Sequence, residues 1–159
     1  MPAYRFRFEQ ILRLRLHYEN EVREQLARKD QQIAAEQQKL EAVRRELEQG
    51  LIDKADDLAA GRLDRVALYA AYFRRLHNAI VWHQDEIERF QKQRAKIVED
   101  LMVKMRERKI MEKLKERKAA QHARHELKRD QKRLDEFANR PSQFATGSES
   151  EPDPGGFGV

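Results

Sequence analysis

The sequence contains no cysteine, which excludes disulfide bonds and thiolate metal sites. It also has no apolar run near the roughly 18 residues that are needed to cross a bilayer. Residues 1–8 lack the apolar stretch and the cleavage site of a secretory signal peptide. We therefore expect a protein that stays in the cytoplasm.

Proline and glycine are nearly absent from most of the chain. Between Ala3 and Arg140 there is no proline, and the only glycines are Gly50 and Gly61. The residues after Arg140 hold three of the four prolines and four of the six glycines. This distribution predicts long helices over most of the chain and a disordered tail over 140–159.

Charged residues make up 38% of the chain and the mean hydropathy is −0.95, a balance that suits either disorder or helices with a narrow apolar stripe. The spacing of the apolar residues favours helices. In the first segment, eight of twelve heptad a and d positions are apolar, and sustained heptads of this kind predict a coiled coil. These positions are Phe8, Leu12, Arg15, Glu19, Val22, Leu26, Lys29, Ile33, Glu36, Leu40, Val43 and Leu47.

A second segment repeats the pattern, with nine of twelve a and d positions apolar or aromatic. They are Val66, Tyr69, Phe73, Leu76, Ile80, His83, Ile87, Phe90, Arg94, Ile97, Leu101 and Lys104. Beyond them the apolar residues shift to Ile110, Leu114, Ala120, Leu127 and Leu134, which indicates that the apolar stripe moves to another face.

The break between the two segments lies near Gly61, which can adopt the left-handed conformation that ends a helix. Asp64 is a candidate N-cap, and Leu63 with Leu68 would form the flanking hydrophobic staple. A connection this short makes the helices antiparallel. The alternative is one continuous helix that dimerises with another chain.

The expected fold is therefore all-α, a long antiparallel two-helix coiled-coil hairpin whose second helix is the longer. We place the first helix at 4–60, the turn at 61–63, the second helix at 64–139 and the tail at 140–159. With a turn centred near residue 62, residue i faces about residue 124 − i, so the second helix outruns the first from about residue 113.

This pairing predicts a well-packed turn end and a loose end where both termini lie, with no domain core and no pocket. Near the termini, Arg15 and Glu19 face Lys104 and Arg108, so Glu19 can pair with either of these cations.

The net charge of +5 is concentrated in one segment. Residues 102–133 hold 13 basic and 5 acidic side chains, whereas residues 1–101 hold 19 and 18. Regularly spaced acids and the near absence of aromatic residues in this segment argue against nucleic acid as its partner. A solvated helix or an acidic protein partner explains the basic segment at least as well.

No P-loop, Rossmann glycine pattern, nucleophile elbow or metalloprotease motif is present, so we expect no enzyme activity, no small-molecule substrate and no cofactor. His122, His125 and Glu126 have a spacing that metal ligands use, but a charged helix produces it by chance. His83 occupies a d position with no carboxylate expected beside it, which favours a structural or contact role over that of a base.

Trp82 falls at a c position, on the outside of the hairpin. An exposed tryptophan there is either a contact hot spot for a partner or a product of local packing, and the sequence leaves both open.

Four segments in this order resemble the FliJ family, the soluble coiled-coil component of the bacterial flagellar type III export apparatus. They are residues 6–15 (FRFEQILRLR), 68–76 (LYAAYFRRL), 112–117 (EKLKER) and 130–136 (DQKRLDE). The resemblance spans about residues 6–140, and Asp130 stands where the family commonly has glutamate.

The resemblance implies a rod similar to the central stalk of rotary ATPases, with three partners: the hexameric export ATPase, the membrane export gate and export chaperones. It also implies a peripheral location at the inner face of the cell membrane, at the flagellar base. The family's gate contact has a spacing that Tyr72, Leu76, Ala79 and His83 meet here, and the C-terminal pattern adds Gln131, Lys132, Asp135 and Glu136 as partner-binding candidates. Leu76 and His83 also occupy heptad d positions, so the primary role of both can be packing in the helix interface, with partner contact second. The alternatives are a generic structural or homodimeric coiled coil and a stalk of the related injectisome.

Overall fold

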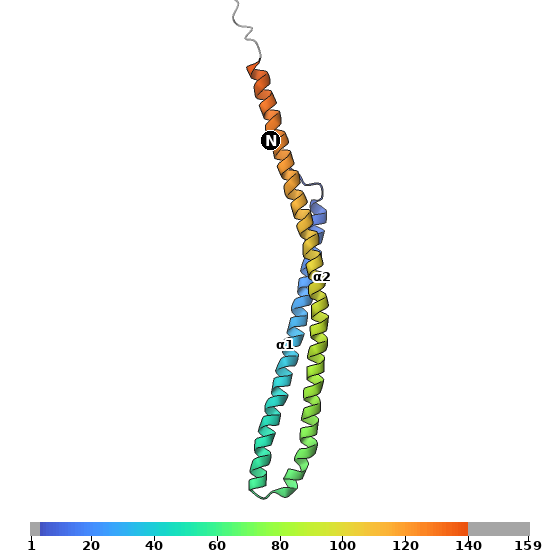
Figure 1. Ribbon diagram of the computed structural model, residues 1–159, viewed down its shortest axis with the longest axis vertical. Helices are drawn as coiled ribbons and strands as arrows, with labels where there is room; N and C mark the ends of the chain where they lie inside the picture. The colour runs from blue at the N-terminus through green and yellow to red at the C-terminus, as the bar shows by residue number, and fades with distance from the viewer. Residues whose placement is uncertain (1–3, 140–159) are drawn as a thin grey trace, which may run out of the picture. The chain divides into compact units, whose positions relative to one another are not determined.

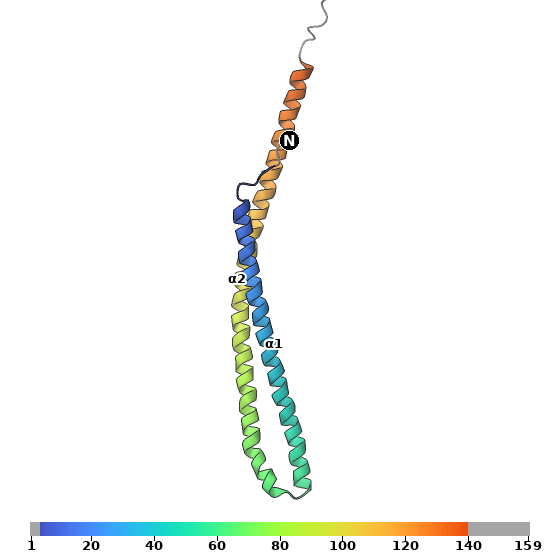
Figure 2. The same cartoon turned by 180° about the vertical axis from the view of Figure 1, so that it is seen from behind.

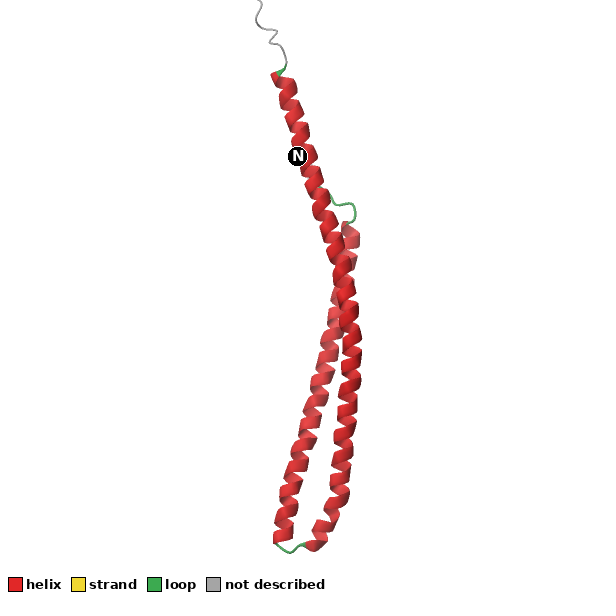
Figure 3. Ribbon diagram, in the orientation of Figure 1, coloured by secondary structure: helices red, strands yellow, loops and turns green. Residues whose placement is uncertain are grey.

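A computed structural model of the chain describes residues 4–139, which form two α-helices and no strand. Helix α1 spans Glu9–Ala59 and helix α2 spans Leu63–Ala138 (Figure 1, Figure 3). The prediction of an all-α fold with a longer second helix is confirmed. The predicted disorder of 140–159 lies outside the described residues. Neither helix contains a stretch apolar enough to span a bilayer within the described range.

The described residues divide into two compact units. The hairpin unit is Arg5–Lys115 and contains α1 with the paired part of α2. The other unit contains Tyr4 and, within the described range, residues 116–139, which continue α2 and end it at Ala138.

In the hairpin unit, α1 and α2 run antiparallel and side by side, as both views show (Figure 1, Figure 2). Two ion pairs across the interface define the register: Glu9 with Lys115 at 2.8 Å and Asp30 with Arg94 at 2.5 Å. Both follow the predicted pairing of residue i with residue 124 − i, which is therefore confirmed at these points. The alternative of one continuous helix is wrong, because the chain reverses between Ala59 and Leu63.

Burial along α1 follows the heptads. All seven buried residues lie at a or d positions once the pattern is continued toward the turn; they are Glu19, Val22, Ile33, Glu36, Leu40, Gly50 and Asp57. Phe8, predicted as a d position, precedes the helix and is 37% exposed. On α2 the predicted shift of the apolar stripe leaves Ile110, Leu127 and Leu134 exposed, so these residues cover no core within the described chain.

The turn is closed by backbone hydrogen bonds around Gly61, whose φ is +74°. The Arg62 N–H donates to the Asp57 carbonyl at 2.9 Å, and the Gly61 N–H donates to the Leu58 carbonyl at 3.1 Å. This pair of bonds is a Schellman motif, and it confirms the predicted role of Gly61. The helix start was predicted wrongly: α2 begins at Leu63, which places Asp64 inside the first turn and not at the N-cap.

The predicted hydrophobic staple is also wrong, since Leu63 and Leu68 are 68% and 72% exposed. The turn end is less well packed than predicted, because the α1 interface positions nearest the turn are Gly50, Lys54 and Asp57. The buried apolar residues of α1 lie farther from the turn, between Val22 and Leu40.

Gly50 allows the helices to approach near the turn. A Cβ atom at this position would lie 2.9 Å from Cε1 of Phe73 and 3.1 Å from Cε1 of Tyr72. Both distances are too short for ordinary packing, so the two aromatic rings occupy space that any other residue at position 50 would need.

We expect Gly50→Val to lower the free energy of unfolding by roughly 1–3 kcal/mol, because the added side chain overpacks the interface and displaces Phe73. The measurement is urea denaturation followed by circular dichroism. The matched control is Ala35→Val, which adds a β-branched residue at an exposed position of α1 and should cost only a few tenths of a kcal/mol. An equal effect of the two changes would contradict the close approach at Gly50.

Candidate partner-binding surfaces

The four predicted gate-contact residues lie on one stretch of α2 within the hairpin unit, but they differ in burial. Leu76 is only 4% exposed and belongs to the interface with α1. Tyr72, Ala79 and His83 are half-buried, which leaves each with surface that a partner can reach. The structure therefore places Leu76 in the core and the other three at its flank.

Tyr72 reaches across to α1, where its hydroxyl donates to Oε1 of Glu46 at 2.6 Å. This hydrogen bond to a carboxylate, reinforced by burial, raises the pKa of Tyr72 above its ordinary value. The phenol therefore stays protonated and holds the Glu46 carboxylate in place.

His83 has a carboxylate partner that the sequence interpretation missed. Its Nδ1 lies 2.8 Å from Oε2 of Glu36, and the two side chains are only 13% and 11% exposed. Lys39 donates to the other oxygen of Glu36 at 2.7 Å. Hydrogen bonds from Lys39 and then His83 lower the pKa of Glu36, so the carboxylate is ionised and the His83 Nδ1 is the donor.

The expectation that no carboxylate lies beside His83 was therefore wrong. The pairing rule places residue 41 opposite His83, and Glu36 is five residues away from that position. An acid at a heptad d position was the feature that could have pointed to Glu36, because a buried carboxylate needs a hydrogen-bonding partner.

Trp82 lies outside the interface, as predicted, and is 55% exposed. Its ring packs edge-on against the His83 imidazole, with 4.9 Å between the ring centroids. The exposed tryptophan and the flank residue His83 thus form one continuous surface. Whether a partner uses it stays a prediction.

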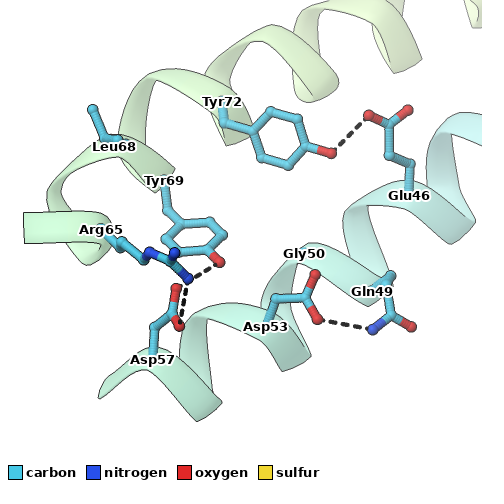
Figure 4. A pocket seen from close by; sticks show the side chains of 9 residues that line it. All are labelled: Glu46, Gln49, Gly50, Asp53, Asp57, Arg65, Leu68, Tyr69 and Tyr72. Atoms are coloured by element: carbon cyan, nitrogen blue, oxygen red, sulfur yellow. Dashed lines mark hydrogen bonds and ion pairs between the residues drawn. The ribbon is translucent and has the colours of Figure 1, made fainter. Parts of the chain in front are cut away.

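Near the turn, the two helices enclose a groove of about 570 Å³ (Figure 4). It is lined from α1 by Glu46, Gln49, Gly50, Asp53 and Asp57, and from α2 by Arg65, Leu68, Tyr69 and Tyr72. The α1 wall of the groove consists of Gly50 and of polar or acidic residues, so no apolar side chain of α1 lines it. The groove contradicts the expectation of a hairpin without a pocket, and the sequence pattern gave no indication of it.

Asp57 lies at the end of the groove that is nearest to the turn. It accepts hydrogen bonds from Arg62 at 2.7 Å and from the Tyr69 hydroxyl at 3.1 Å, and Arg65 lies 4.0 Å away. The Arg62 guanidinium lowers the pKa of Asp57 against the opposing effect of burial. Asp57 therefore holds α1, the turn and α2 together at this end.

A buried ionic network lies nearer the N-terminus of α1. Glu19 is 1% exposed and pairs with Arg108 of α2 at 2.5 Å and with Arg23 of its own helix at 2.6 Å. The predicted pairing of Glu19 with Arg108 is confirmed. Arg15 pairs with Glu107 at 2.6 Å, a partner that the sequence interpretation missed.

In the other unit, the second group of predicted contacts lies on α2 and is exposed: Gln131, Lys132, Asp135 and Glu136. The ring of His122 lies 5.4 Å from that of Tyr4, between centroids. Among the described residues, no group of three or more histidine and acidic side chains is placed to hold a metal ion.

The sequence profile of the family described as Flagellar FliJ protein matches residues 4–144, which is nearly the whole chain. No curated protein matches the chain, and no solved structure does.

Proposed function

Because the chain belongs to the flagellar FliJ protein family, we propose that it acts as a non-enzymatic stalk in flagellar protein export, binding the export ATPase ring, the membrane export gate and export chaperones. The observation that carries the proposal is the combination of this family membership with a hairpin of two long helices. Such a hairpin has side-chain surface along its length but no domain core, which suits a protein that works by contacting others.

The basic segment 102–133 supports the contact with the ATPase ring. Within the described residues, eight of its cations are exposed and form no ion pair: Arg106, Lys109, Lys113, Arg117, Lys118, Arg124, Lys128 and Lys132. Cations that are not neutralised internally attract an acidic surface over several ångströms and accelerate its encounter. We propose that these side chains steer docking onto an acidic surface of the ATPase ring.

Replacing Arg117, Lys118, Arg124 and Lys128 with glutamine should lower the association rate with the ATPase about tenfold or more at low salt. Raising the ionic strength should slow the unmodified protein toward the rate of this variant, because salt screens exposed charges. The measurement is surface plasmon resonance across a salt series.

The matched control replaces four exposed cations of the hairpin unit that also form no ion pair, Arg13, Arg44, Arg74 and Lys96, with glutamine. It changes the net charge equally. A salt-independent association rate, or an equal loss in both variants, would refute steering by the basic segment.

For the export gate, we propose that the contact is made by the flank residues Tyr72, Ala79 and His83 together with the exposed Trp82. These residues provide an aromatic and small-residue surface that is continuous with the hairpin interface. Leu76 is buried next to this surface and supports it by packing in the helix interface. Peripheral location at the membrane follows from this contact, and the exposed residues Gln131, Lys132, Asp135 and Glu136 are proposed as further partner contacts.

A further inference from the structure

The groove near the turn has more acidic charge than the chain neutralises. Of its three carboxylates, only Asp57 is paired with cations, namely Arg62 and Arg65. Glu46 accepts a hydrogen bond from the neutral Tyr72 hydroxyl at 2.6 Å, and Asp53 accepts one from the neutral Gln49 amide at 2.9 Å. Neither forms an ion pair with a described residue. Figure 4 shows both carboxylates at the groove, with Tyr72 reaching from the opposite helix.

Aromatic rings complete the groove. Tyr69 and Tyr72 line its α2 side, and the faces of their rings offer the electron-rich surface that attracts cations. The guanidinium of Arg75 from the same helix already lies over the Tyr72 ring, 5.6 Å from its centroid. Gly50 lies in the α1 wall, and its missing side chain lets the rings of Tyr72 and Phe73 approach α1 closely. At the rim, Leu68 is 72% exposed and provides an apolar contact.

The sequence segment around the turn is acidic overall. Residues 46–69 hold six acidic and three basic side chains, a net charge of −3, in a protein whose total is +5. Among the residues that the structure describes, Arg65 is the only cation that lines the groove, and it lies 4.0 Å from Asp57. Consistently, the pKa values of both lining tyrosines are raised, that of Tyr72 first by its hydrogen bond to Glu46 and that of Tyr69 first by burial and then by Asp57.

We propose that this groove is a docking site for a protein segment that inserts a lysine or arginine side chain between Glu46, Asp53 and the two tyrosines. An aliphatic neighbour of that cation packs on Leu68. The occupant is defined by charge complementarity: two uncompensated carboxylates and two aromatic walls select a cationic side chain, and the volume of about 570 Å³ is within the range of small ligand sites. This inference does not depend on the export role proposed above.

The probe is the tripeptide Leu-Arg-Leu, acetylated and amidated, and its matched control carries citrulline, the uncharged isostere of arginine. The protein is labelled with ¹³C in its tyrosine rings, and peptide is titrated while ring resonances are recorded. We expect saturable shifts of Tyr69 and Tyr72 with the arginine peptide and roughly tenfold weaker binding of the citrulline peptide. Tyr18 is the internal reference, because it lies on α1 away from the groove beside Lys104.

Glu46→Gln combined with Asp53→Asn should weaken binding of the arginine peptide by roughly the same factor. The control Glu48→Gln with Asp56→Asn removes two exposed acids near the turn that do not line the groove, and it should bind like the unmodified protein. Circular dichroism establishes that both variants fold. The comparison of arginine with citrulline needs no variant, so the proposal is tested even if the groove variant unfolds.

Three results would overturn the proposal: equal binding of the two peptides, no saturable shift at Tyr69 and Tyr72, or an equal effect of the two double variants. The last would mean that the general acidity of the turn region attracts cations without a defined site. Loss of self-association in the groove variant, with no peptide binding by the unmodified protein, would identify a second copy of this chain as the occupant. ATPase association is measured separately, so failure here leaves that proposal standing.

Discussion

Arg108→Leu should lower the free energy of unfolding by about 3 kcal/mol, because it removes the cross-helix partner of a carboxylate that is almost fully buried. Breaking a buried pair from one side typically costs about 3–5 kcal/mol, and Arg23 remains to hold one oxygen of Glu19, which places the effect at the low end. The measurement is urea denaturation. Arg94→Leu is the control, since its partner Asp30 is about half exposed and solvent compensates the loss.

Replacing both partners should reverse the effect. In Glu19→Leu with Arg108→Leu, no charge is left buried and two apolar side chains fill an interface position, so we expect stability equal to or above that of the unmodified protein by about 1–4 kcal/mol. A double-mutant cycle with both single variants isolates the coupling. A double variant as unstable as Arg108→Leu would show that packing, not the unpaired charge, determines the loss.

The same network predicts a dependence on pH. Burial raises the pKa of Glu19, but the hydrogen bonds and charges of Arg108 and Arg23 outweigh it, so the pKa is lowered from its ordinary value of 4.5. The stability that the ionised group contributes is therefore present above pH 4.5 and is lost as the pH falls through the lowered pKa of the folded state. The double leucine variant should lose less stability than the unmodified protein over this range, as thermal unfolding at pH 7 and pH 3 would show.

Leu76→Ala is the second large expected effect, a loss of roughly 2–4 kcal/mol, because it deletes a side chain that is 4% exposed and leaves a cavity between the helices. Leu76 belongs to the set that the family resemblance implicates in the gate contact, so weakened binding in this variant has two possible causes. Thermal unfolding by circular dichroism measures the loss of stability. Gate binding at a temperature where the variant is fully helical measures the loss of a direct contact.

Under those conditions we expect Leu76→Ala to bind the gate nearly as well as the unmodified protein. Trp82→Ala is the matched surface change, since Trp82 is 55% exposed, and it should weaken gate binding about tenfold while leaving the unfolding temperature nearly unchanged. The opposite pattern, with impaired binding by a fully folded Leu76→Ala and normal binding by Trp82→Ala, would place Leu76 in the contact and contradict the burial seen here.

These predictions divide the gate-contact set into supporting and contacting residues. Heptad spacing by itself assigns both Leu76 and His83 to d positions of α2. In the structure, however, the two side chains have different surroundings. Leu76 is almost fully buried, whereas His83 donates to Glu36 and its ring lies against that of Trp82. His83 can therefore contact a partner directly, whereas the buried Leu76 cannot.

The sequence alone determined the two helices, their antiparallel order and the place of the turn. Heptads over a proline-free range dictate helices that bury one stripe, and Gly61 is free to adopt the positive φ that ends α1. The pairing of residue i with residue 124 − i also followed from the turn position, and it located the partners Glu9–Lys115 and Asp30–Arg94. These features depend on backbone periodicity and chain connectivity, which sequence spacing encodes directly.

Only the tertiary structure decided which polar side chains meet and where the interface is left unfilled. Glu36 reaches His83 from a position five residues off the pairing rule, because long side chains lean along the helix and select partners by charge and direction. Gly50 lies in the α1 wall of the groove, where the missing Cβ lets Tyr72 and Phe73 approach α1 while Glu46 and Asp53 remain without cations. Heptad spacing identifies which residues face the partner helix, but the space between the helices is set by the sizes and orientations of side chains from both of them.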